Sequence, residues 1–181
     1  MGLVIEDGLG TGQLAQVEDN RLEVCARTLP RIAYNSWDRG TTFSWSYTFD
    51  PAAADTLLLV SNSDTQKLLY IHAVLVGSDT NCQWAIHSPP YPTLAGTVVT
   101  GVNTNRTSGK IALAEAYGGE TGNNIANGVV FYRGFSLAYG APALVLAEGS
   151  VVLGYHQIIA VDLVGAANPA AATCTILGWY E

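Results

Sequence analysis

The sequence is poor in charged residues. They make up 13% of the 181 residues, against about 25% in a typical soluble domain, and Lys67 and Lys110 are the only lysines. The net charge is -7, and the clustered Lys and Arg on which sequence-independent binding to nucleic acid depends are missing. A surface with so little charge predicts that partners cover much of it.

Cysteine is also scarce. Cys25, Cys82 and Cys174 lie far apart and form no CxxC pair, which argues against a zinc site or a disulfide framework and predicts buried, reduced thiols. No run approaches the ~18 consecutive apolar residues of a membrane-spanning helix. Glu6 and Asp7 stand where a secretory signal would carry positive charge, so we expect a protein made in the cytoplasm and not exported by a signal peptide.

Catalytic motifs are missing as well. No G-x-S-x-G is present, and Ser136 is one residue out of that pattern. His72, His87 and His156 fall in neither an H-x-H nor an H-E-x-x-H pattern. Glu115 and Glu120 could form a carboxylate pair of the glycosidase kind, but we interpret them as solvated loop residues. The sequence therefore predicts no enzyme, no cofactor and no metal, with a metal-dependent cupin-like enzyme as the lesser alternative.

The pattern that is present is all-β. Residues 41–49 alternate Phe43, Trp45, Tyr47 and Phe49 with Ser and Thr, the period of a half-buried strand. Further strands are predicted at residues 56–60, 67–76, 82–87, 94–100, 110–117, 129–135, 143–146, 151–164 and 173–180, with a turn of helix as the alternative at 112–116. The proline-rich residues 88–92 predict an edge or a loop. Turn signals about every 8 to 12 residues, without a convincing amphipathic helix, indicate a sandwich or a barrel.

The first residues form a distinct segment. Three glycines at alternate positions follow an apolar start, and neither the lysine nor the helix of a phosphate-binding loop accompanies them. We therefore predict that residues 1–30 form an extended arm for docking and assembly, followed by a single β-sandwich at residues 31–181. The arm residues expected to take part are Val4, Ile5, Gly8, Gly10, Gly12, Val17, Arg21 and Leu22.

Aromatic side chains near predicted strand ends and loops are candidates for surface binding, because exposed rings stack on sugars and anchor protein interfaces. Trp37 and Tyr91 are the two that we single out. Packing in the core and rim of a sandwich is the alternative, since aromatic residues favour strands.

The chain resembles a group of tailed-bacteriophage virion proteins, small capsid-associated proteins of the decoration or cement type. The similarity rests on Val4-Ile5-Glu6-Asp7-Gly8-x-Gly10-Thr11-Gly12 with Val17-x-x-Asn20-Arg21-Leu22. It continues in Gly40-Thr41-Thr42-Phe43, in the leucine-rich run Leu57-Leu58-Leu59-Val60-Ser61-Asn62-Ser63-Asp64, and in the Gly149-Ser150 turn. The chain also closes on a strand, as in that group.

The resemblance implies a jelly-roll-like sandwich, a homo-oligomer that is often a trimer, and a structural, non-enzymatic place on the virion. Its partners would then be copies of itself and the major capsid protein or other virion proteins, with no direct nucleic acid and no membrane. Decoration or cementing of the capsid shell through oligomerisation and arm exchange is the first hypothesis. The second is a tail, neck, baseplate or fibre component that binds host-surface glycan.

Overall fold

The computed structural model describes residues 30–50, 56–89, 95–120, 128–164 and 171–181, together with residues 5–6, 14–15, 17–18 and 21–22. The chain divides into two compact units, Met1–Pro30 and Arg31–Glu181. In the first unit, β1 (Ile5–Glu6) pairs with β2 (Leu14–Ala15), and β3 (Val17–Glu18) pairs with β4 (Arg21–Leu22). Both pairs are antiparallel.

The second unit begins with one short helix, α1 (Arg31–Trp37), and continues as strands. The eight principal strands are β5 (Thr42–Phe49), β6 (Thr56–Asn62), β7 (Leu69–Ser78), β8 (Cys82–Ser88), β12 (Val129–Ser136), β13 (Ala143–Leu153), β14 (Ile158–Val164) and β15 (Ala172–Tyr180). Between β8 and β12 the chain adds β9 (Thr97–Val98), β10 (Val102–Asn103) and β11 (Ala114–Glu120).

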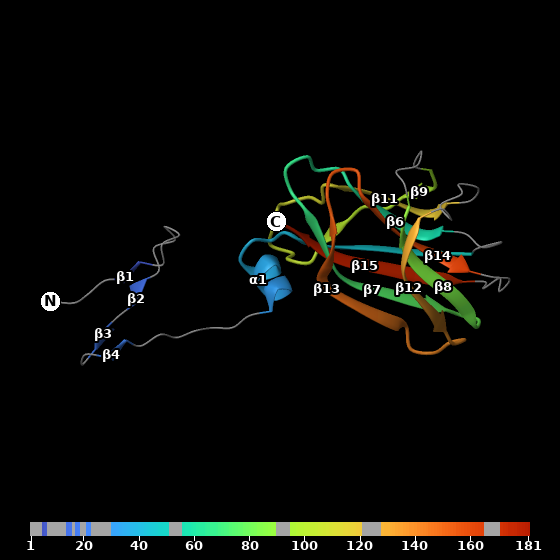
Figure 1. Cartoon of the computed structure of the whole chain (residues 1–181), viewed down its shortest axis with the longest axis horizontal. Helices are drawn as coiled ribbons and strands as arrows, with labels where there is room; N and C mark the ends of the chain where they lie inside the picture. Colours follow the sequence, from blue (N-terminus) through green and yellow to red (C-terminus); the bar gives the residue numbers. More distant parts are fainter. Residues whose placement is uncertain are drawn as a thin grey trace. The chain divides into compact units, whose positions relative to one another are not determined.

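These strands form two antiparallel sheets packed as a sandwich (Figure 1). One sheet has the order β10-β5-β15-β7-β13 and the other the order β12-β8-β14-β6-β11-β9. Counted along the chain, the eight principal strands stand in the orders 1-8-3-6 and 5-4-7-2, which is the strand order of a jelly roll. The prediction of an all-β, jelly-roll-like sandwich is confirmed.

The core lies between the two sheets. The predicted alternation of residues 41–49 is confirmed, because Phe43 and Trp45 are buried there and Tyr47 and Phe49 pack against them. Cys82 and Cys174 are buried free thiols in this core, as predicted, whereas Cys25 lies outside the described residues. Burial in the core raises the pKa of the Cys174 thiol, because an apolar surrounding disfavours the thiolate.

The predicted division of residues 143–164 is wrong. The turn expected at Gly149 is a bulge inside β13, which runs on to Leu153. Glu148 and Gly149 take positive φ values of 48° and 82° there, and the local twist of a bulge absorbs them without reversing the chain. The reversal comes later: the backbone N–H of Gln157 donates to the carbonyl of Gly154 at 3.0 Å, so β14 begins only at Ile158.

Three smaller predictions also need correction. Residues 112–116 form no helix, since β11 begins at Ala114 and pairs with β6, and Glu115 and Glu120 therefore lie in a strand rather than a loop. Of the strand predicted at residues 94–100, the described part contains only β9. Helix α1 was not predicted, because seven residues give too short a period for an amphipathic pattern and most helical stability comes from tertiary packing.

Candidate assembly interface

The binding residues predicted from the sequence are only partly described. Trp37 ends α1 and is 60% exposed, and its carbonyl accepts a hydrogen bond from Asn105 Nδ2 at 3.3 Å. Tyr91 lies outside the described residues. Among the predicted arm residues, Ile5, Val17, Arg21 and Leu22 lie in the short paired strands, whereas Val4, Gly8, Gly10 and Gly12 are outside the described residues.

His87, Asp162 and Thr56 form a cluster of the kind found in active sites, but the His87 side chain is buried. On the outer face of the six-stranded sheet, His87 Nε2 contacts the carboxylate of Asp162, whose Oδ1 accepts a hydrogen bond from Thr56 Oγ1 at 2.8 Å. The His87 residue is 2% exposed, so its ring meets protein on all sides and offers no surface to a substrate. The three side chains tie β8, β14 and β6 together.

The remaining chemical groups that the sequence suggested are structural or scattered. Ser136 is buried, where it bonds to Trp84 and to the carbonyl of Val76. Among the residues that the structure describes, no three His, Cys, Asp or Glu side chains come together as metal ligands. The described part of the chain also contains no helix long and apolar enough to cross a membrane.

The sheet edges differ in a way that points to an interface. An exposed edge strand invites pairing with another chain, and proteins protect such edges with short strands, bulges or charges. Strands β9 and β10 have two residues each, and β13 carries the bulge at Glu148 and Gly149. Strand β12 has eight residues, its bulge falls at the apolar Phe131, and Arg133 is its single charge. Among the described strands, β12 and β13 are the two long apolar edges, and each has one bulge and one charged residue. The bulge of β13 carries its charge, Glu148, whereas the bulge of β12 is apolar.

The side chains of this edge are exposed on both faces of β12 and along the turn that follows it. We call them the β12 patch: Val129, Val130, Phe131, Tyr132, Phe135, Leu137 and Tyr139. Phe135, opposite Gln83 on the face away from the core, is 72% exposed. Contiguous apolar surface of this kind marks sites of protein association.

An apolar groove continues the β12 patch between the two sheets. It holds about 280 Å³ between Phe131 and Tyr132 of β12 and Val145 and Leu146 of β13, with Ile86 among the residues below. The two edge strands lie on the same side of the sandwich in Figure 1. The sandwich is therefore open along this side, where a further strand or side chain would find both unpaired backbone and apolar surface.

The core holds β12 in place. The indole ring of Trp84 stacks on Tyr132 with the ring centroids 5.9 Å apart. A Cβ added to Gly134 would collide with the same indole, so the glycine lets β12 lie directly over Trp84. An edge fixed in this way loses little conformational entropy when a partner binds.

Sequence reasoning located β12 but missed its exposure. Residues 129–135 carry apolar side chains at both odd and even positions, a pattern typical of a strand buried on both faces. Only the position of β12 at the end of its sheet leaves these side chains uncovered. Comparison of the chain with protein-family models, with curated proteins and with solved structures found no match.

Proposed function

We propose that this protein is a non-enzymatic structural subunit that assembles with copies of itself through the β12 patch. The observation that carries the proposal is the long apolar edge strand β12, whose side chains are exposed on both faces and whose bulge carries no charge. Strands β9 and β10 have only two residues each, and the bulge of β13 carries Glu148. Pairing of that edge with a second copy would satisfy its free backbone groups and cover Phe135 and its neighbours.

The distribution of charge favours a second copy as the occupant. Each chain carries a net charge of -7, so two copies repel each other except where charges are few. Residues 128–147, which include β12, its turn and the start of β13, contain one charged residue, Arg133. Contact along this segment brings two copies together with the least electrostatic cost.

We propose further that the assembly is part of a bacteriophage particle, where it decorates or cements the capsid shell and docks its arm on a neighbour. The support for this is the resemblance carried by residues 4–22 together with the sandwich and its self-association edge. The trimeric state and the major capsid protein as partner belong to the same proposal. The copy number per purified particle tests it: hundreds of copies fit shell decoration, whereas about a dozen or fewer fit a neck or tail part.

A second candidate is a tail, neck, baseplate or fibre component that binds host-surface glycan. The observation in its favour is the exposure of Trp37 at the end of α1, because exposed aromatic rings stack on sugars. Binding on a glycan array that is lost in Trp37→Ala or Tyr91→Ala would favour this function. A cupin-like enzyme would require stoichiometric metal in the purified protein, lost in His72→Ala.

The test of self-association compares two exposed apolar side chains on edge strands. Phe135 is 72% exposed on β12 and Val98 is 70% exposed on β9. Sedimentation of Phe135→Lys should show monomers at concentrations where the wild type is oligomeric, while Val98→Lys should sediment as the wild type does. A monomeric wild type at tens of micromolar, or an oligomeric Phe135→Lys, would contradict the proposal.

A further inference from the structure

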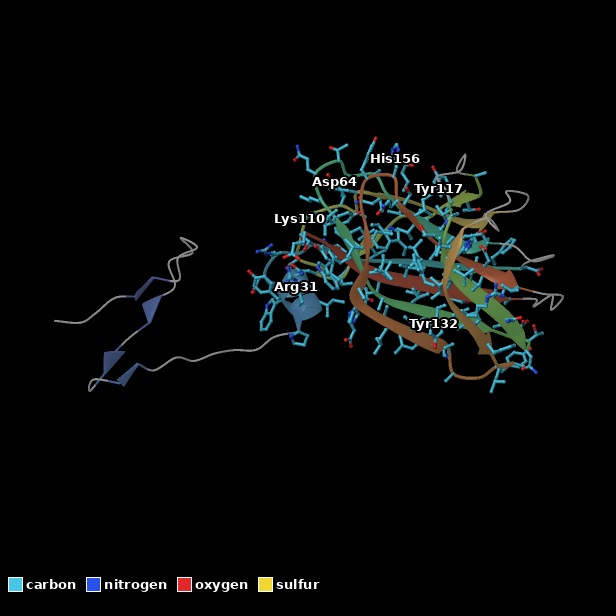
Figure 2. The ribbon with its side chains drawn as sticks, in the orientation of Figure 1. Arg31, Asp64, Lys110, Tyr117, Tyr132 and His156 are labelled. Atoms are coloured by element: carbon cyan, nitrogen blue, oxygen red, sulfur yellow. The ribbon has the colours of Figure 1, made fainter. Side chains whose placement is uncertain are left out.

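The positive charge of the second unit gathers at one end. Residues 31–181 contain six Lys and Arg side chains, and all except Arg133 belong to this end: Arg31, Arg39, Lys67, Arg106 and Lys110. Figure 2 shows Arg31, Lys110 and Asp64 toward the end of the domain at which Figure 1 marks the C-terminus, whereas Tyr132 lies farther along the domain. We call the five cationic residues the basic pole.

Direct contacts hold the basic pole together. Arg31 and Arg39 both lie against the carboxylate of Glu181, and this bond raises the pKa of Arg31. The ammonium group of Lys110 donates to the carbonyl of Arg39 at 2.7 Å. The turn that carries Arg106 is fixed by Asn105 Nδ2, which donates to the carbonyl of Ser36 at 2.9 Å.

A pocket of about 310 Å³ opens within the pole, and both lysines of the chain line it. Its apolar part comes from Phe43, Ile111 and Leu113. Tyr180 also lines it, is 3% exposed, and has a hydroxyl without a hydrogen-bond partner; the backbone N–H of Leu113 faces this hydroxyl without reaching hydrogen-bond geometry. The pocket thus places the two lysines of the chain beside an apolar floor, under which the Tyr180 hydroxyl is buried.

The carboxylates near the two lysines already have other partners. Glu181 binds the two arginines, and Asp64 Oδ1 accepts from the backbone N–H groups of Gln66 and Lys67 at 2.8 and 3.2 Å. No carboxylate among the described residues pairs with either lysine ammonium group. The acids that contact these five cations, bond to their backbone or adjoin them in the chain are Glu181, Asp64 and Asp38, so cations outnumber these acids in a protein that is negative as a whole.

The first unit has the complementary charge. Residues 1–30 contain two cations, Arg21 and Arg27, against five acids: Glu6, Asp7, Glu18, Asp19 and Glu23. Strands β1 and β2 pair with each other, as do β3 and β4, so one side of each strand is already hydrogen-bonded.

We propose that the Lys67–Lys110 pocket receives a Glu or Asp side chain from the N-terminal unit of a second copy. The inference rests on the proposed function, in which the arm docks on a neighbour, and it names the place of docking. Carboxylate binds ammonium by charge-assisted hydrogen bonds, and the apolar floor reduces the screening that weakens ion pairs in open solvent.

Zero-length cross-linking of the full-length chain tests this directly. A carbodiimide joins carboxylates to amines, and apart from the terminal amine the chain offers only Lys67 and Lys110. Equal amounts of unlabelled and 15N-labelled protein are mixed, cross-linked and analysed by mass spectrometry of the peptides. We expect mixed-isotope links between the acids of residues 6–23 and one of the two lysines.

Three results would overturn the inference. The lysines could be cross-linked only to Asp38, Asp64 or Glu181, or they could form no cross-links at all. Cross-links to the arm could also join peptides of a single isotope only, which would place the arm against its own chain. In a second measurement, the double variant Lys67→Gln, Lys110→Gln should weaken self-association by roughly two- to fivefold at low salt. The charge-preserving double variant Lys67→Arg, Lys110→Arg should retain it. Association unchanged by the Gln pair contradicts the inference. The β12 proposal is judged separately, by the sedimentation of Phe135→Lys.

Discussion

Trp84 donates its indole N–H to Ser136 Oγ at 3.0 Å, and Ser136 in turn donates to the carbonyl of Val76 at 3.1 Å. Trp84 and Ser136 belong to neighbouring strands of the six-stranded sheet, whereas Val76 belongs to β7 of the other sheet. One buried hydroxyl therefore fixes the last residue of β12 and joins the two layers beside the assembly edge.

Ser136→Ala should destabilise the fold by about 1 to 3 kcal/mol, because it leaves the buried indole N–H of Trp84 without its partner and removes the bond to the Val76 carbonyl. Denaturant unfolding measures the change. Ser46→Ala is the control, since the Ser46 hydroxyl bonds to Thr175 on the exposed surface and its loss should cost within about 0.5 kcal/mol. Equal stability of the two variants would show that the link through Ser136 contributes little.

Gly134→Ala should also destabilise the protein, since the added methyl group would collide with the indole of Trp84. Overpacking of this kind costs about 1 to 3 kcal/mol, and here it should also displace β12 and weaken self-association. Gly109→Ala meets no atom within 4 Å and should be neutral or slightly stabilising. Thermal unfolding of both variants gives the comparison, and a Gly134→Ala protein as stable as Gly109→Ala would contradict the packing argument.

His87 and Asp162 should be energetically coupled, so that the effects of replacing them on the free energy of unfolding are not additive. Asp162→Ala removes the partner of both His87 and Thr56, and we expect a loss of about 1 to 3 kcal/mol. A double-mutant cycle with His87→Phe should give a coupling energy of about 0.5 to 3 kcal/mol. Asp50→Ala, at an exposed position after β5, should change stability little, and strictly additive effects at His87 and Asp162 would contradict the prediction.

Stability should fall in alkaline solution because of Tyr180. Burial raises the pKa of Tyr180 above its ordinary value of 10.0, so above that pH the unfolded chain releases the phenolic proton while the folded chain keeps it. Because the unfolded state then binds fewer protons, its free energy falls relative to the folded state, by up to about 1.4 kcal/mol per pH unit.

Tyr180→Phe removes this contribution, so its unfolding free energy should fall less steeply than that of the wild type above about pH 10. Urea unfolding at a series of pH values measures both curves. Tyr139→Phe, at an exposed position of the β12 patch, is the control and should follow the wild type. Parallel curves for the wild type and Tyr180→Phe would refute the assignment.

The success of strand prediction followed the strength of the local pattern. In residues 41–49 each buried side chain is flanked by Ser or Thr, so the sequence alone fixes which face meets the core. The break between β13 and β14 could not be predicted, because residues 151–164 are apolar on both sides of it. The reversal there depends on a turn in which His156 takes a φ of 59°, a conformation that glycine or Asn would have announced more clearly.

Some features of the candidate sites could be predicted from the sequence and others could not. The low charge, the acidic first unit and the presence of only two lysines are properties of the sequence, and they predict association without enzymatic machinery. That Lys67 and Lys110, 43 positions apart, share one pocket could not be foreseen, because their proximity depends on how the ends of distant strands meet.

The sequence by itself determined the all-β class, the buried thiols and the lack of charge around β12, since each follows from local composition and from the two-residue period of a strand. Only the tertiary structure decided which strand lies at an edge and which cations gather at one end. Edge position depends on pairing between strands far apart in the chain, so the side chains of Val129 to Tyr132 and of Phe135 became an exposed surface through topology alone.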